Sequence, residues 1–144
     1  MALVYFDSSA LVKLVVEEEG SDLVAALSDG CDAALSSRLA YPEVRAALAA
    51  AGRNHDLDER DLAFAERALG RLLGRHPSRR AHACGERSAG GLAKQHGLRG
   101  AGAIHLASAL AVKTPDLIVA VWDRRLHAGV AAERLALAPA TLES

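Results

Sequence analysis

Along the chain, short apolar runs alternate with longer segments in which apolar residues recur every three or four positions. The short runs are typical of buried strands, and they cover residues 4–6, 33–36, 117–122 and, at a possible sheet edge, 135–138. The longer segments have a helical period, and they cover residues 10–18, 22–28, 37–51, 58–73, 92–96, 101–112 and 124–132. Strands that alternate with helices indicate an α/β fold, a three-layer α/β/α sandwich around a parallel sheet of four to five strands.

Capping and breaking residues set the predicted helix boundaries. Ser9 is expected to cap the first helix, because a serine hydroxyl can accept a hydrogen bond from a free backbone N–H of the first turn. Gly20 and Gly30 are expected to end the first two helices. Pro42 is tolerated only near the first turn of its helix, where its missing N–H costs least.

Residues 74–91 interrupt this alternation. The stretch 74–85 contains almost no large apolar residue and is rich in Arg, Ala, His and Gly. An α/β domain of this kind would be expected to place a buried strand near here, and none is visible. We therefore predict a loop, a poorly ordered segment or a weak strand.

Composition narrows the class of protein. The 144 residues suit one domain, residues 1–144, with a normal core, which must be built from Ala, Leu and Val because only 3% of residues are aromatic. The two cysteines have no metal-ligand spacing, which fits a reducing cytosol. Because no signal peptide or membrane-spanning run is visible, we expect a cytoplasmic protein without a membrane partner.

Charge is unevenly distributed although the net charge is only −1. Residues 1–69 hold 13 acids and 6 Lys or Arg, whereas residues 70–100 hold 7 Lys or Arg and one acid. Such a basic surplus could bind phosphates. An ordinary solvated face, or a surface for an acidic partner, explains it at least as well.

Three apolar runs lead to carboxylates. Asp7 follows the first predicted strand, Glu43 follows the second through two serines, and Asp123 follows the third. Because the carboxyl ends of parallel strands meet at one edge of a sheet, these acids can converge where open α/β sheets bind ligands. Carboxylate oxygens suit Mg²⁺ or Mn²⁺, which can activate a water and neutralise a phosphodiester oxygen. Asp7, Glu43 and Asp123 are therefore the predicted metal ligands and catalytic residues.

Each of these acids also has a simpler interpretation. Asp7 could cap the first helix, Glu43 could be an ordinary surface glutamate, and Asp123 could be a turn or helix-capping residue. Taken singly, the simpler interpretation is as good for Asp7 and Asp123 and better for Glu43. Their joint placement at the ends of predicted strands favours metal binding.

Four segments carry a family resemblance. They are FDSSALVKL (6–14), SSRLAYPEVR (36–45), LRGAGAIHLASAL (98–110) and WDRRL (122–126). In this order and spacing they resemble the four motifs of PIN-domain nucleases, specifically the VapC toxins of bacterial toxin–antitoxin pairs. The resemblance spans nearly the whole chain.

The resemblance implies a PIN-like fold, one or two Mg²⁺ or Mn²⁺ ions and endonucleolytic cleavage of RNA. By the motif match, Asp7 is a metal ligand, Glu43 is a ligand or orients the attacking water, and Asp123 is a ligand, directly or through water. Ser8 or Ser9 is expected to hold a carboxylate or a water. His105 also matches a motif position, but its place on an apolar helix face favours packing over catalysis.

The third motif departs from the family pattern at Gly102, where the family has an aspartate that is a principal metal ligand. Glycine offers no ligand and adds backbone freedom at a helix start. Loss of an outer-shell partner alone typically costs roughly 10–100-fold in metal affinity or activity, and loss of a direct ligand should cost at least that. Asp116 cannot substitute, because it precedes a strand and should lie at the opposite edge of the sheet.

Two functional hypotheses follow. The first is a metal-dependent endoribonuclease toxin that retains three of four acids. The second is a catalytically impaired PIN-fold protein that binds an antitoxin and dimerises without efficient cleavage. A phosphoaspartyl phosphatase is set aside, because it would need an acid two residues after Asp7, where Ser9 stands. The resemblance implies a VapB-type antitoxin, RNA and a second copy of the chain as partners, with the apolar faces of 38–51 and 58–73 as candidate contacts if they do not pack internally.

Overall fold

Four parallel strands form the centre of the structure, a computed structural model that describes residues 1–75 and 84–143. The strand order is β2-β1-β3-β4, and β1 pairs with both β2 and β3. All four predicted strands are confirmed, each within two residues of its expected ends. They are β1 (Leu3–Phe6), β2 (Ala33–Leu35), β3 (Leu117–Ala120) and β4 (Ala136–Ala138).

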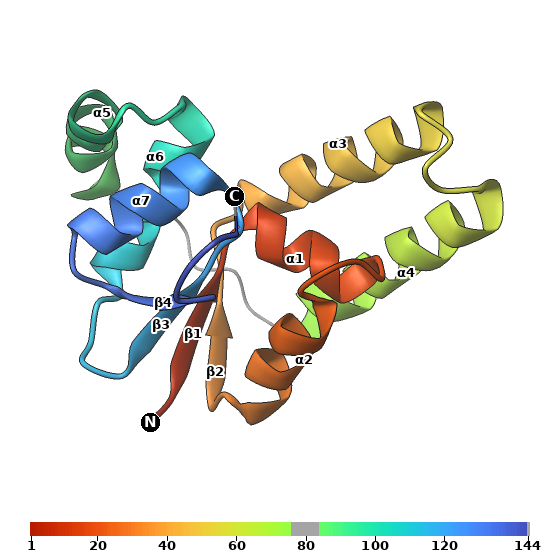
Figure 1. The fold of residues 1–144 in the computed structure, drawn as a ribbon, viewed down its shortest axis with the longest axis horizontal. Helices are drawn as coiled ribbons and strands as arrows, with labels where there is room; N and C mark the ends of the chain where they lie inside the picture. The colour runs from red at the N-terminus through yellow and green to blue at the C-terminus, as the bar shows by residue number, and fades with distance from the viewer. Residues whose placement is uncertain (76–83, 144) are drawn as a thin grey trace.

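Helices cover both faces of this sheet (Figure 1). One layer consists of α1 (Ser8–Val15), α2 (Ser21–Gly30), α3 (Ala40–Arg53) and α4 (Glu59–Arg75). The other consists of α5 (Cys84–His96), α6 (Gly100–Ala111) and α7 (Arg124–Ala132). The predicted three-layer α/β/α sandwich is therefore confirmed. Within the described ranges, no helix is both long enough and apolar enough to cross a membrane.

The core is split into two halves by the sheet. Val4 and Phe6 of β1 pack with α1–α4, whereas Tyr5 packs with α5–α7. This division follows from the strand geometry, since successive side chains point to opposite faces. All three side chains are only 2% exposed, which explains why the first strand carries no polar residue before its end.

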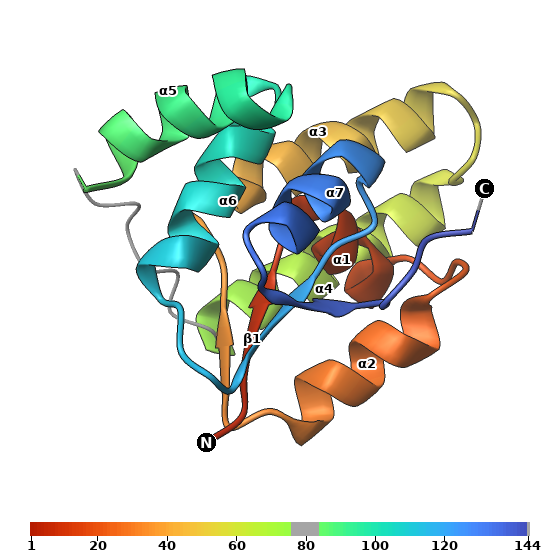
Figure 2. The same cartoon turned by 60° about the vertical axis from the view of Figure 1, so that its left-hand side comes forward.

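α3 and α4 pack against each other and extend beyond the sheet as a helical pair (Figure 1, Figure 2). Ala65 and Leu69 lie on the buried face of α4, as the helical period predicts. Phe64 lies on its other side and is 58% exposed, which is unusual for so large an apolar residue.

Of the two residues that the sequence offers as caps of the first helix, Asp7 is the observed cap and Ser9 is not. Asp7, not Ser9, is the N-cap of α1, and its Oδ1 accepts a hydrogen bond of 2.9 Å from the Ala10 N–H. Asp7 has extended backbone angles at the end of β1, which bring its carboxylate within reach of the third helical residue. Ser9 lies inside the helix, where its hydroxyl is free for other partners.

The prediction for residues 74–91 is wrong at both ends of the stretch, because α4 continues to Arg75 and α5 begins at Cys84. Residues 76–83 lie outside the described part of the chain, and the prediction stays untested for them. The stretch looks unlike a helix in sequence because residues 84–91 contain no large apolar residue. Such a helix shows a weak apolar period in sequence.

Candidate active site

Three predicted acids line one cavity of about 520 Å³ at the carboxyl edge of the sheet. Asp7 directly follows β1, Glu43 lies in the first turn of α3, and Asp123 precedes α7. The parallel register places these ends together, since Phe6 is paired with Ala120 of β3. The structure thus brings together side chains that are 36 to 116 positions apart in sequence.

Asp7 is the most buried of the three acids, at 3% exposed. Its Oδ1 accepts hydrogen bonds from the Ser9 hydroxyl at 2.6 Å and from the Ala10 N–H at 2.9 Å. Burial raises the pKa of the Asp7 carboxyl to about 6, although both hydrogen bonds oppose the rise. The carboxylate is therefore held in a place where its negative charge lacks full compensation.

Asp123 is exposed and caps α7, with Oδ1 accepting a hydrogen bond of 2.8 Å from the Leu126 N–H. The Ser9 hydroxyl links this loop to the first strand, because it accepts from the Trp122 N–H at 2.8 Å while donating to Asp7. Both aspartates are thus helix caps, and each uses only Oδ1 for capping. Neither Oδ2 atom has a hydrogen-bond partner among the described residues.

Glu43 is held by two donors on one oxygen. Its Oε1 lies 2.7 Å from the Ser8 hydroxyl and 2.7 Å from Nε2 of His105. Partial burial would raise the pKa of Glu43, but the hydrogen bonds from His105 and Ser8 outweigh it and lower the pKa overall. Glu43 is therefore an ionised carboxylate and more than a surface residue.

The prediction that His105 serves packing alone is incomplete. The ring is 3% exposed and stands edge-to-face with Tyr5, with ring centroids 5.9 Å apart, so it does pack in the core. Its Nδ1 also lies 2.8 Å from the Tyr5 hydroxyl, and its Nε2 reaches Glu43. The motif spacing indicates only that His105 shares a helix face with Gly102, three residues before it, and does not show which groups His105 contacts.

Gly102 lies in the first turn of α6 and lines the same cavity. A Cβ atom at this position would meet only the Leu98 side chain, at 3.8 Å, which is ordinary van der Waals contact. The site therefore has room for a side chain that the sequence lacks. Asp116 does not replace it, because its carboxylate lies 3.5 Å from the N-terminal amine before β1, at the opposite edge.

The donor groups of the cavity bear on whether it can bind a divalent cation. Within the described ranges, no three His, Cys, Asp or Glu side chains are placed to hold one ion together. Mg²⁺ commonly binds one or two carboxylates and keeps several waters. The residues present fit such an ion, since the buried Asp7 carboxylate has a free oxygen and an uncompensated charge that a cation would neutralise.

Three arginines line the cavity beside the acids. Arg99 comes from the predicted basic segment, and Arg124 and Arg125 come from the start of α7. Two other arginines of that segment, Arg79 and Arg80, lie outside the described residues. Guanidinium groups bind phosphate oxygens in a bidentate manner, so the cavity combines acids for a cation with cations for an anion.

Comparison with known proteins identifies the family. No protein-family model matches the chain. Two Mycobacterium tuberculosis proteins, Ribonuclease VapC45 of strain CDC 1551 / Oshkosh and Ribonuclease VapC49 of strain ATCC 25618 / H37Rv, are each 62% identical to it over 143 residues. The alignments cover 99% of this chain and 99% of each relative. The chain belongs to the VapC family.

Solved structures confirm the fold of this VapC-family chain. FitAcB from Neisseria gonorrhoeae matches with a TM-score of 0.67 at 17% identity, covering 93% of this chain and 95% of that one. VapBC2 from Rickettsia felis, bound to a DNA fragment from their promoter, matches with a TM-score of 0.60 at 12% identity, covering 94% and 96%. At these identities the likeness shows the fold alone, and it agrees with the predicted PIN-like architecture.

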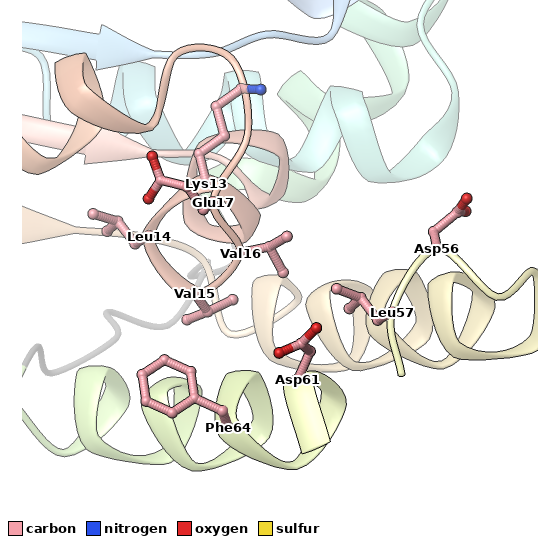
Figure 3. Close-up of a pocket in the computed structure, with 9 residues that line it drawn as sticks. All are labelled: Lys13, Leu14, Val15, Val16, Glu17, Asp56, Leu57, Asp61 and Phe64. Carbon is pink, nitrogen blue, oxygen red and sulfur yellow. The ribbon is translucent and has the colours of Figure 1, made fainter. Parts of the chain in front are cut away.

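A second cavity, of about 500 Å³, shares no lining residue with the first and lies between α1, α4 and the loop before α4 (Figure 3). Val15, Val16, Leu57 and Phe64 gather within it, whereas Lys13 points away from them. Its acidic lining residues are Glu17, Asp56 and Asp61. The apolar faces of 38–51 and 58–73, predicted as candidate partner contacts, are mostly buried within the fold. In the described part of α4, the large apolar side chain that stays exposed is Phe64, which lines this cavity.

Replacing Asp7 tests the buried charge. Folding raises the pKa of Asp7 from 3.8 to about 6, so between these pH values the folded protein keeps a proton on Asp7 that the unfolded chain has lost. The free energy of unfolding therefore falls as the pH rises from about 4 to about 6. Asn retains the cap without the charge. We expect Asp7→Asn to unfold with a free energy higher by up to about 3 kcal/mol at pH 7.5, and by much less at pH 4.

Urea unfolding at the two pH values measures this difference. Asp123→Asn is the matched control, because Asp123 is an exposed cap, and it should change stability little at either pH. A D7N protein that is less stable than the wild type at pH 7.5 would contradict the account of Asp7.

Proposed function

We propose that this VapC-family chain acts in the cytoplasm as a Mg²⁺- or Mn²⁺-dependent endoribonuclease, the toxin of a VapBC-type pair. The observation that carries the proposal is the cavity itself. Three carboxylates, one of them buried, line it together with three arginines. Its 62% identical relatives are named as ribonucleases.

Asp7 would hold the cation, with Asp123 and Glu43 acting directly or through water. When bound, a divalent cation lowers the pKa of a water and neutralises charge on a phosphodiester. Glu43 is ionised and held on one oxygen, so its other oxygen can orient the attacking water and accept its proton. The arginines would bind neighbouring phosphates, so RNA affinity should fall as salt rises.

Gly102 favours a site of reduced metal affinity. The alternative function, an antitoxin-binding protein that cleaves little RNA, rests on the same residue. We expect Gly102→Asp to raise Mn²⁺-dependent cleavage at limiting metal by about 10-fold or more, because it adds a carboxylate where a side chain fits. Cleavage of a fluorescent RNA across a Mn²⁺ titration measures this.

Gly102→Asn is the matched control, since it adds similar bulk without charge and should give no gain. Asp7→Asn should abolish cleavage in both backgrounds. Equal cleavage by the native and G102D proteins would refute the role given to position 102. Cleavage by G102D alone would favour the binding function for the native chain.

We further propose that a VapB-type antitoxin docks on the second cavity (Figure 3). Phe64 is 58% exposed there beside apolar residues of α1, a pattern typical of an interaction site. The acidic lining favours a partner segment that combines apolar and basic side chains. A second copy of the chain is the competing occupant, because the family resemblance also implies a homodimer.

Phe64→Ser is expected to weaken antitoxin binding by roughly 10-fold or more, as an exposed aromatic anchor would. It should leave thermal stability nearly unchanged, because the side chain is largely exposed. Calorimetry with the cognate antitoxin measures the affinity, with Leu23→Ser on α2 as control, since Leu23 is 39% exposed and lines neither cavity. If Phe64→Ser leaves the affinity unchanged, the antitoxin docks elsewhere. If Phe64→Ser abolishes a dimer that light scattering detects without antitoxin, the second cavity is the contact between two copies of the chain.

A further inference from the structure

A chain of hydrogen bonds runs from the core to the cavity. Tyr5, in the middle of β1, is 2% exposed, and its hydroxyl lies 2.8 Å from Nδ1 of His105. Nε2 of His105 lies 2.7 Å from Oε1 of Glu43 and 3.1 Å from the Ser8 hydroxyl. Residues from β1, α1, α3 and α6 thus form one network, in which Ser8 and His105 both contact Oε1 of Glu43 and Tyr5 contacts His105.

The partners of His105 determine where its ring proton lies. An ionised carboxylate can only accept hydrogen bonds, so Nε2 must carry a proton to contact Glu43. In the neutral ring Nδ1 is then an acceptor, and the Tyr5 hydroxyl is placed to donate to it. Burial strongly raises the pKa of Tyr5, so its phenol retains the proton that it donates.

Glu43 depends on such support. Its side chain is 28% exposed at the cavity, and a glutamate in the first turn of a helix otherwise has several rotamers available. Both donors, Ser8 and His105, contact Oε1. They fix the carboxylate through one oxygen and leave Oε2 for the cavity.

We propose that His105 is a positioning residue, which Tyr5 holds with its proton on Nε2 so that Glu43 keeps one orientation toward the cavity. The role in RNA cleavage rests on the proposed function. The placement of the Glu43 side chain does not, and it can be measured without RNA or metal. Ser8 is the second donor and cannot replace the first, because it approaches from α1 while His105 supports Glu43 from α6.

Two amide variants separate the ring nitrogens. The amide nitrogen of glutamine can lie near the position of Nε2, and that of asparagine near Nδ1. His105→Gln should therefore keep the contact to Glu43, whereas His105→Asn should lose it. We expect kcat for RNA cleavage to fall roughly 10–100-fold in H105N, the range typical of outer-shell partners, with KM within about threefold. H105Q should retain most of kcat.

Nuclear magnetic resonance supplies the readouts that do not need activity. Imidazole ¹⁵N shifts of His105 should show a protonated Nε2 and a bare Nδ1. Methylene relaxation of Glu43 should show a side chain that is rigid in the wild type and in H105Q, and mobile in H105N. If H105N does not fold, Tyr5→Phe provides a second test, because it removes only the hydroxyl. Nδ1 of His105 then loses its donor, and kcat should fall with KM unchanged.

A bare Nε2, a fully protonated ring, or equal Glu43 order in H105Q and H105N would overturn the proposal. So would equal kcat in the two amide variants. If the wild type cleaves no RNA but the relaxation difference is seen, the proposed function fails and the positioning role stands.

Discussion

The burial of one carboxylate, that of Asp7, constrains most of this structure. The residue ends the central strand, and only 3% of it is exposed, so its charge lacks full solvation. Two donors reach it, the Ser9 hydroxyl and the Ala10 N–H, and they offset the burial only in part, as the raised pKa of about 6 shows. A site that keeps such a charge at a cost in stability is typical of functional carboxylates.

Helix capping explains how the fold can position these acids on rigid elements. Asp7 and Asp123 each cap a helix with one oxygen and keep the other oxygen free of protein partners among the described residues. Ser9 joins the two loops, since it donates to Asp7 and accepts from the Trp122 N–H. Each aspartate can therefore cap a helix with one oxygen and still offer the other to a metal ion.

The sequence predicts the sheet well and the site in outline. Strands such as 117–122 are visible because burial on both faces demands continuous apolar runs. Residues 92–96 of α5 are predicted as helix, but residues 84–91 are not, because they contain no large apolar residue that would give a helical period. The role of His105 was missed for a different reason: a buried histidine looks the same in sequence whether it only packs or also contacts a carboxylate. That distinction depends on Tyr5 and Glu43, which only the fold brings beside it.

We propose that the cavity lined by Asp7 binds a divalent cation despite Gly102. Paramagnetic broadening by Mn²⁺, added in small steps to ¹⁵N-labelled protein, tests it most directly. We expect the amides of residues 8–10, 102 and 123 to broaden first, and those around Phe64 not to broaden. Broadening that begins at the exposed acids of the second cavity, or none near Asp7 at millimolar Mn²⁺, would contradict the account.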